Sequence, residues 1–360
     1  MRIAVLTHGV SPFGHQLAEA FVRLGHEAEI ISMTSFEFGV GGRIRMRVLG
    51  PPDFKPWETN ARSVYLKMVG SLRSALRETR PDVLLALYLS SAGVLARLSG
   101  HPHVVVSALG SDVNQRIGSR FWRAVFRWVC RRAVLVHAVS EPLAQTLAST
   151  VGVDAAKLLV MPIGIDTREL AYTDPAARPN AGELICTRAH KPLYDHATLV
   201  RAMARLKARG VRCHLTFTSR TQVESTKALV CEHGVEDVVT FLPGYEYAEL
   251  PSLLGSRDVY VSTSQSDGTS QSLLEALSTG TFPVVSDIQA NRPWVEHGRT
   301  GLLFPPGDDA ALADRLAEAL ARPDLRAAAA PLNRRLAVEK GDINRLVGRL
   351  LAAFERCLST

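Results

Sequence analysis

Short apolar runs alternate with amphipathic segments from the first residues of this chain. Residues 3–6 predict a buried strand, 14–24 a helix and 28–32 a second strand. The same alternation returns over residues 183–285. Short buried strands joined through helices form parallel sheets that are covered on both faces. The pattern therefore predicts an α/β fold built from doubly wound, Rossmann-like sheets.

The chain is long enough for two such sheets. Its 360 residues exceed one α/β core of this kind, which takes roughly 150–200 residues. One series of strands and helices occupies residues 1–170 and the other residues 183–342. The intervening 171–182 is rich in proline, alanine and polar residues, which predicts a linker. Residues 343–360 are amphipathic, and we expect them to pack back on the first domain. Two facing domains imply a ligand-binding cleft.

Positive charge is concentrated in the first half of the sequence. Residues 1–165 contain 19 Lys and Arg against 11 Asp and Glu, while the whole chain has a formal charge of +7. This uneven charge favours an anionic partner, which can be a phosphate-bearing substrate, acidic lipid or nucleic acid.

The N-terminus enters the first predicted strand directly, without the features of a signal peptide. No apolar run approaches the roughly 20 residues that cross a bilayer. The five cysteines are widely spaced and form no CxxC pair, which argues against a zinc or redox site. We therefore expect a cytoplasmic protein.

The segment 264–280 joins a loop after a buried strand to the start of a helix. Asp267 and Gly268 lie in the loop, Thr269 and Ser270 precede the helix, and Glu275 follows in its early turns. A helix N-terminus favours an anion, and Gly268 lets the backbone approach a diphosphate closely. Two carboxylates beside a phosphate site suit the vicinal hydroxyls of a sugar. The segment therefore predicts a binding site for a nucleotide sugar.

A structural interpretation of the same residues stays open. Ser272 and Glu275 have the spacing of a capping box, in which the glutamate only fixes the start of a helix. Asp267 and Gly268 also form an ordinary turn sequence. Spacing alone does not decide between these interpretations.

The residues that follow carry a resemblance to a known family. The acids Asp267 and Glu275 are separated by seven residues, and an E-A-L-S-T-G turn, a P-V-V strand and a G-L-L strand come next. This order resembles retaining glycosyltransferases of sequence family four, which have the GT-B fold. The resemblance implies that Asp267, where the family usually has glutamate, contacts the transferred sugar. It also implies that Glu275 contacts the ribose of the donor nucleotide.

Two cations follow the predicted strand 183–186. Arg188 and Lys191 resemble the family's Arg and Lys pair, which neutralises the donor diphosphate, although here they are more closely spaced. Arginine can grip a diphosphate through two parallel hydrogen bonds. With the amides of the helix start these cations could carry the phosphate charge, so we expect no metal and no other cofactor. The alternative is that both are solvated loop residues.

Three residues of the first half are also candidates. Gly14 and His15 belong to a loop that resembles the family's glycine-rich loop facing the diphosphate, and His15 could instead be an ordinary residue of the first helical turn. Asp112 ends a segment that resembles the family's His-Gly-x-Asp motif, with Leu109 in the place of the histidine. Asp112 could equally cap the following segment.

A basic, aromatic helix is predicted over 119–132. One face of this helix carries four arginines, Arg120, Arg123, Arg127 and Arg131. The other face is apolar and consists of Trp122, Val125, Phe126 and Val129. With Arg43, Arg45 and Arg47, this helix favours a peripheral position on the inner face of a membrane. In the competing interpretation, the apolar face is core and the arginines are solvated.

Together these features predict a retaining glycosyltransferase of the hexosyltransferase type. It would move a sugar from a nucleoside diphosphate sugar, bound by the second domain, to a hydroxyl of a saccharide or lipid-linked acceptor, bound by the first. Such a reaction belongs to cell-envelope or exopolysaccharide biosynthesis. A sugar-nucleotide epimerase of the same two-domain shape and a non-catalytic nucleotide-sugar sensor are the alternatives. A nucleic-acid-binding module fits the charge but not the motifs, so we expect no nucleic acid.

Overall fold

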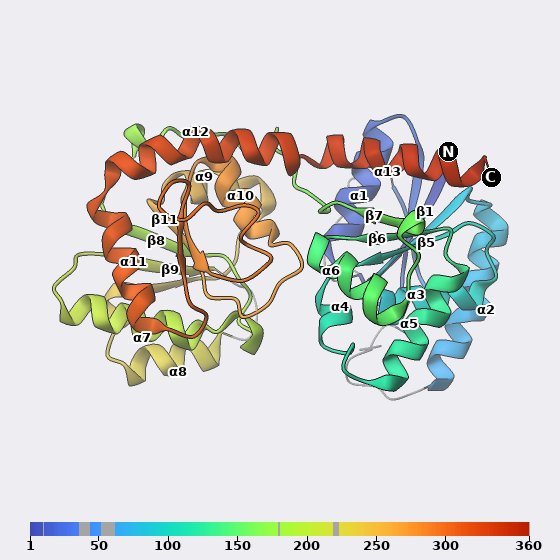
Figure 1. The fold of residues 1–360 in the computed structure, drawn as a ribbon, viewed down its shortest axis with the longest axis horizontal. Helices are drawn as coiled ribbons and strands as arrows, with labels where there is room; N and C mark the ends of the chain where they lie inside the picture. The colour runs from blue at the N-terminus through green and yellow to red at the C-terminus, as the bar shows by residue number, and fades with distance from the viewer. Residues whose placement is uncertain (10, 36–43, 52–61, 179–180, 219–222, 360) are drawn as a thin grey trace. The chain divides into compact units, whose positions relative to one another are not determined.

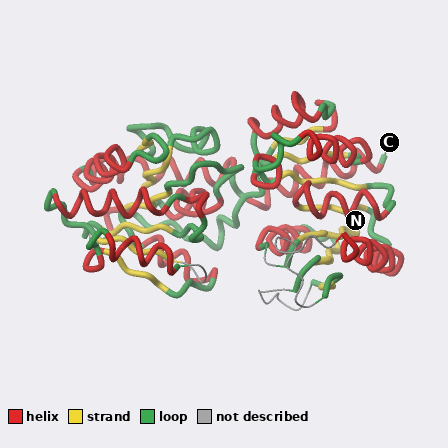
Figure 2. Tube along the Cα trace, turned by 90° about the horizontal axis from the view of Figure 1, so that it is seen from below, coloured by secondary structure: helices red, strands yellow, loops and turns green. Residues whose placement is uncertain are grey.

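The computed structural model describes residues 1–9, 11–35, 44–51, 62–178, 181–218 and 223–359. The chain forms two compact units. Unit 1 comprises Met1–Ile163 with Ile343–Thr360, and unit 2 comprises Gly164–Asp342. Within each unit, strands lie between layers of helices, as the ribbon in Figure 1 and the tube in Figure 2 show. The predicted pair of Rossmann-like α/β domains is confirmed.

Unit 1 is built on a seven-stranded sheet with the order β3-β2-β1-β4-β5-β6-β7. All neighbouring strands are parallel. The strands are β1 (Arg2–Thr7), β2 (Glu27–Ser32), β3 (Arg45–Val48), β4 (Val83–Leu87), β5 (Val104–Ala108), β6 (Leu135–Ala138) and β7 (Leu158–Val160). The strand order changes direction between β1 and β4, and ligands of open α/β sheets bind at such a switch point.

Helices cover both faces of this sheet. They are α1 (Pro12–Arg23), α2 (Arg62–Thr79), α3 (Gly93–Ser99), α4 (Ser111–Asn114), α5 (Arg120–Arg132), α6 (Glu141–Thr146) and α13 (Ile343–Leu358), with π-helical turns η1 (Tyr88–Ala92) and η2 (Leu147–Val151). The last helix, α13, packs on α1, where the rings of Phe354 and Phe21 lie 6.2 Å apart. Its apolar stripe is buried in the core of unit 1, as its 3.6-residue periodicity requires.

Unit 2 has a six-stranded parallel sheet with the order β10-β9-β8-β11-β12-β13. The strands are β8 (Glu183–Cys186), β9 (His214–Thr218), β10 (Val239–Leu242), β11 (Val259–Ser262), β12 (Phe282–Ser286) and β13 (Leu302–Phe304). The helices are α7 (His196–Ala208), α8 (Glu224–Glu232), α9 (Leu250–Gly255), α10 (Gln271–Thr279), α11 (Asp309–Ala321) and α12 (Pro323–Lys340). The strands β8 and β11 are neighbours at the centre, so the loops that follow them meet at one edge.

The segment 171–182, predicted to be a linker, is part of unit 2. The Arg178 side chain is buried, and its guanidinium donates hydrogen bonds to the carbonyls of Thr173, Thr279 and Arg257 at 2.7–3.0 Å. The chain passes between the units at Ile163–Gly164 and again at Asp342–Ile343. Proline, alanine and polar residues are typical of linkers, but here one buried arginine holds such a segment in place.

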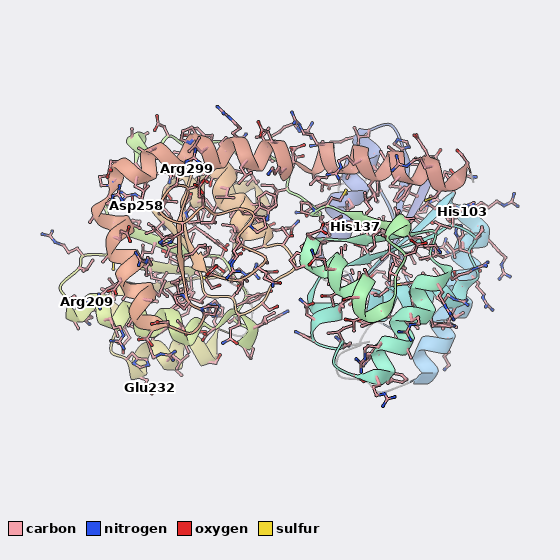
Figure 3. All side chains as sticks on the ribbon, in the orientation of Figure 1. His103, His137, Arg209, Glu232, Asp258 and Arg299 are labelled. Atoms are coloured by element: carbon pink, nitrogen blue, oxygen red, sulfur yellow. The ribbon has the colours of Figure 1, made fainter. Side chains whose placement is uncertain are left out.

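The same segment is anchored at its end by Asp258, which Figure 3 labels inside unit 2. Its carboxylate accepts hydrogen bonds from the amides of Gly182 and Glu183 at 2.9 and 3.0 Å.

Within the described residues, no helix is both long and apolar enough to span a bilayer.

Candidate active site

Arg188 lies just beyond the end of β8 and is the centre of a polar cluster in unit 2. Its guanidinium donates to the Asp267 carboxylate at 2.6 Å and to the hydroxyls of Ser270 and Ser272 at 3.0 and 3.1 Å. Only 9% of the residue is exposed. Charge-assisted hydrogen bonds in such a buried place are strong and fix the orientation of the arginine. The structure therefore brings together Arg188, Asp267 and Ser270, all three of which are predicted site residues.

Two tyrosines that the sequence did not single out hold this arginine in position. The Arg188 guanidinium carbon lies 3.9 Å from the centre of the Tyr194 ring, a cation–π arrangement. The Tyr260 hydroxyl lies 2.8 Å from the Ser272 hydroxyl, which contacts the arginine in turn. Tyr194 is the last residue of the 3-10 turn Pro192–Tyr194. Its contact with Arg188 depends on how this turn folds against the end of β8, which the local sequence does not show.

The helix α10 begins at Gln271, and its N-cap is Ser270. The Ser270 hydroxyl accepts a hydrogen bond from the Leu273 amide at 3.3 Å. Glu275 is thus the fifth helical residue, whereas a capping box requires the third. The capping-box interpretation of Ser272 and Glu275 therefore does not hold, since the helix is capped two residues earlier, by Ser270, and Ser272 bonds Arg188 instead.

Glu275 is a buried carboxyl with only 7% of its surface exposed. Burial raises its pKa to about 7, although the positive charge of Arg188 opposes the shift. Burial, followed by the charge of Glu275, also raises the pKa of Tyr245 and of Tyr247, which places both phenols near this carboxyl. Among the described residues, the buried Tyr247 hydroxyl has no hydrogen-bond partner. This group of acid and phenols can accept from and donate to the hydroxyls of a ligand.

Asp267 and the residues beside it form the loop before α10. One Asp267 oxygen bonds Arg188, and the other accepts from the Gly268 amide at 3.0 Å. Gly268 is buried and Thr269 half-buried. Since each carboxylate oxygen has a second lone pair, Asp267 keeps acceptor capacity for a ligand while it is paired with Arg188.

Lys191 is placed differently from its predicted partner. The residue is exposed, and its side chain makes no hydrogen bond or ion pair with the described residues. Its amide donates to the Ala189 carbonyl at 2.9 Å, where the chain turns away from the end of β8. The structure does not join Lys191 to the Arg188 cluster.

The candidates of the β1–α1 loop have roles in packing. A Cβ atom on Gly14 would lie 2.7 Å from the Thr7 side chain, so glycine lets α1 approach β1 closely. This packing against Thr7 accounts for the glycine, and the approach of the Gly14 backbone to a ligand stays a prediction. His15 is buried in the first turns of α1, and burial lowers the pKa of its imidazole.

Asp112 fixes two loops of unit 1 to each other. Its carboxylate accepts from the amides of Leu89 and Leu109 at 2.6 and 3.0 Å. Burial raises its pKa, while these amides oppose the shift. Both oxygens are engaged by backbone at the start of η1 and after β5, so the structure gives Asp112 a positioning role.

A polar cluster that the sequence did not reveal lies at the ends of β1 and β4. The hydroxyls of Ser11 and Tyr88 lie 3.0 Å apart, and the His8 Nε2 atom lies 2.9 Å from the Ser91 hydroxyl. Tyr88 has a φ of 77°, a conformation that non-glycine residues adopt at a cost and that often marks functional sites. Burial lowers the pKa of His8 to about 4, so this imidazole is neutral at physiological pH. The only sequence signal is that imidazole and hydroxyl side chains follow the two strand ends.

Two doubly wound α/β units, one with an arginine and two carboxyls at the carboxyl edge of its sheet, are the architecture expected of the GT-B class of glycosyltransferases. Comparisons with known proteins give the same class. The fold matches sucrose-phosphate synthase from Thermosynechococcus elongatus with a TM-score of 0.86, 18% identity and coverage of 100% of this chain and 99% of that one. Residues 7–169 match Glycosyltransferase Family 4, and residues 178–335 match Glycosyl transferases group 1. The chain belongs to this family of glycosyltransferases and is an enzyme.

Two curated relatives are mannosyltransferases. The MMP alpha-(1->4)-mannosyltransferase of Mycolicibacterium hassiacum is 24% identical over 415 residues, covering 100% of this chain and 99% of the relative. The GDP-mannose-dependent alpha-(1-6)-phosphatidylinositol monomannoside mannosyltransferase of Mycobacterium tuberculosis is 30% identical over 244 residues, covering 63% of this chain and 61% of the relative.

Proposed function

We propose that this enzyme transfers a sugar from a nucleoside diphosphate sugar to an acceptor hydroxyl with retention of anomeric configuration. The observation that carries the proposal is the buried Arg188, which joins Asp267 and the start of α10 within one network. In this assignment Arg188 binds the donor diphosphate. Asp267 accepts hydrogen bonds from the transferred sugar, and Glu275 accepts them from the ribose.

The proposed reaction exchanges one bond at the anomeric carbon for another. The bond from that carbon to the diphosphate oxygen breaks, and a bond to the acceptor oxygen forms on the same face of the sugar. The acceptor's proton passes to the departing diphosphate. Arg188 stabilises the negative charge that develops on the diphosphate, and its fixed orientation means that little reorganisation is needed.

No divalent cation takes part in this proposal. Arg188 and the amides at the start of α10 supply the positive potential that a metal ion would otherwise supply. Lys191, although exposed, is close enough in sequence to Arg188 to add to this potential when the donor is bound.

The proposed acceptor is a saccharide or lipid-linked intermediate of cell-envelope or exopolysaccharide synthesis. Support comes from the relative whose name specifies transfer to a phosphatidylinositol monomannoside, and from the basic first half of the chain. An acceptor of this kind is met at a membrane, so we further propose that the enzyme works at the inner face of the membrane as a peripheral protein.

The test is incubation of the enzyme with labelled UDP-, GDP- and ADP-sugars in the presence and absence of lipid and oligosaccharide acceptors. We expect release of nucleoside diphosphate to be coupled to labelling of an acceptor, with the anomeric configuration of the donor retained. Conversion of the donor sugar without any acceptor would instead identify the epimerase, and nucleotide-sugar binding without turnover would identify the sensor.

A further inference from the structure

Three neighbouring helices of unit 1 carry a surface with almost uniform positive charge. The helix α2 contacts α3, and α3 contacts α5, so the three lie side by side against the sheet (Figure 1). Together they contain ten Lys and Arg and a single acidic residue, Glu78. The basic residues are Lys67, Arg73, Arg77, Arg97, Arg120, Arg123, Arg127, Arg131 and Arg132, together with Arg62, whose side chain lies outside the described part of the protein. We call the surface formed by α2, α3 and α5 the basic face.

The charge of the basic face is not neutralised by the described part of the protein. None of the arginines on α3 and α5 forms an ion pair with a described residue, while Glu78 pairs with Arg47 on β3 at 2.6 Å. Of the other predicted basic residues, Arg45 is exposed on β3 and Arg43 lies outside the described residues. The basic face therefore presents an open positive field to any anionic partner.

Two aromatic side chains are exposed among these arginines. Phe121 is 67% and Trp128 38% exposed, and they lie seven residues apart, on the same side of α5. The side chains of Arg120 and Arg131 are exposed on that side as well. The guanidinium of Arg97, from α3, lies 4.7 Å from the centre of the Trp128 ring.

The opposite side of α5 is core. Phe126 and Val129 are buried, and Trp122 and Val125 are half-buried against the same cluster. Core packing therefore explains the inner side of the helix. On the outer side, the Phe121 ring lies edge-on to the Trp122 ring, with centroids 5.6 Å apart, and stays largely exposed. Large exposed apolar side chains beside unpaired cations are typical of a surface that binds a partner.

We propose that the basic face docks on a bilayer of anionic phospholipid, with Phe121 and Trp128 at the level of the headgroups. Guanidinium groups bind phosphate with matched geometry, and each basic side chain near an anionic surface raises the affinity about fivefold. Aromatic rings with polar neighbours partition to the membrane–water interface. The basic face itself is defined by charge and exposure alone. The choice of a membrane as the partner rests on the proposed function, since an envelope glycosyltransferase meets its acceptor at a membrane.

The experiment is co-sedimentation of the full chain with vesicles of phosphatidylcholine alone and of phosphatidylcholine mixed with phosphatidylglycerol. We expect binding to the anionic vesicles only. The binding should weaken when NaCl is raised from about 0.1 M to about 1 M, since the Debye length falls from about 10 Å to about 3 Å. Equal binding to both kinds of vesicle would overturn the electrostatic part of the proposal.

A charge-reversal set locates the surface. Arg120, Arg131 and Arg132 are exposed, and their side chains make no hydrogen bond or ion pair with described residues, so their change to Glu should leave the fold intact. The triple variant should lose at least about 100-fold in affinity for anionic vesicles. The matched control changes three other exposed arginines to Glu, Arg212 and Arg335 in unit 2 and Arg349 on α13, with the same change in net charge. Equal losses in both variants would contradict a defined basic face.

An aromatic set tests insertion. Phe121→Ser and Trp128→Ser should each weaken vesicle binding severalfold, while Leu24→Ser, at an exposed apolar residue that follows α1, should not. If both aromatic variants bind as tightly as the wild type, the rings do not enter the interface and the proposal fails in this part. Binding of double-stranded DNA as tight as the binding of anionic vesicles would show that the partner is nucleic acid and overturn the proposal.

Nucleotide binding separates this inference from the proposed function. Stabilisation by UDP, GDP or ADP in thermal unfolding should be the same in the wild type and the charge-reversed variant, because the proposed donor site is in unit 2. Vesicle binding by a wild-type protein that no nucleotide stabilises would refute the proposed function and leave the basic face established.

Discussion

Arg188 is the residue on which the proposed chemistry depends most. Its guanidinium makes three hydrogen bonds in fixed directions and stacks on Tyr194. Lysine keeps the charge but cannot reproduce this geometry. We expect Arg188→Lys to lower kcat/KM by about 10²- to 10³-fold in the transfer assay. Arg212→Lys, at an exposed position of the same unit, is the control. Retention of more than half of the activity by Arg188→Lys would show that the guanidinium geometry does not matter.

Glu275 gives a prediction about stability that is separate from activity. Its pKa in the folded protein is about 7, above the ordinary value of 4.5, so the folded state binds this proton more tightly than the unfolded state does. Stability contributed by this group is therefore present at low pH and is lost as the pH rises from about 4.5 through 7. Above pH 7 the buried charge costs up to about 3 kcal/mol.

The variant that tests this is Glu275→Gln, which cannot ionise. Without ligand, it should raise the Tm relative to the wild type at pH 8 and have much less effect at pH 5. The same variant should weaken donor binding, since an amide is a poorer acceptor than a carboxylate for ribose hydroxyls. Equal Tm differences at the two pH values would mean that the Glu275 carboxyl is not held in a costly environment.

At the residue scale, the sequence predicts positions better than contacts. Arg188, Asp267 and Glu275 could be found because strand ends and helix starts are visible as local patterns. Tyr194 and Ser272 could not, since stacking beneath Arg188 and bonding to it depend on how separate loops meet. Lys191 fits the pattern of a second cation, but its side chain is exposed and makes no hydrogen bond or ion pair with the described residues.

Among the elements, α13 joins the end of the chain to unit 1. Phe354 is fully buried and contacts Phe21 on α1. Phe354→Ala should cost about 3–5 kcal/mol in the free energy of unfolding of unit 1, measured by urea denaturation. Arg349→Ala, exposed on the same helix, should cost less than about 0.5 kcal/mol. If Phe354→Ala costs no more than the control, the last helix does not support the core of unit 1.

A strand or helix can be predicted from the sequence only where its apolar residues recur with a clear period. The buried strand β4 is uniformly apolar, and β1 and β5 are mostly apolar, so their pattern is clear. The edge strand β3 has the sequence RMRV, in which arginines replace the apolar signal. In α5 the core side is visible in the pattern, but the exposure of Phe121 and Trp128 depends on how far the neighbouring helices cover the outer side of the helix, which the local sequence does not show.

For the whole molecule, the proposal that Arg188 replaces a metal ion predicts insensitivity to chelation. Sugar transfer should keep most of its rate in EDTA, and adding Mg²⁺ or Mn²⁺ should change it less than about twofold. Rates are compared at equal ionic strength, because added salt alone screens charges. A loss of transfer in EDTA that a single divalent cation restores would show that the diphosphate charge is carried by a metal.

The central claim is that unit 2 binds a nucleoside diphosphate through Arg188. Calorimetric titration of UDP, GDP and ADP into the wild type, Arg188→Ala and Arg212→Ala tests it most directly. We predict that at least one nucleotide binds the wild type and Arg212→Ala with equal affinity. Binding to Arg188→Ala should be weaker by about 10- to 100-fold, the worth of one or two charge-assisted hydrogen bonds. No binding by any of the three nucleotides, or equal binding by Arg188→Ala, would contradict the claim.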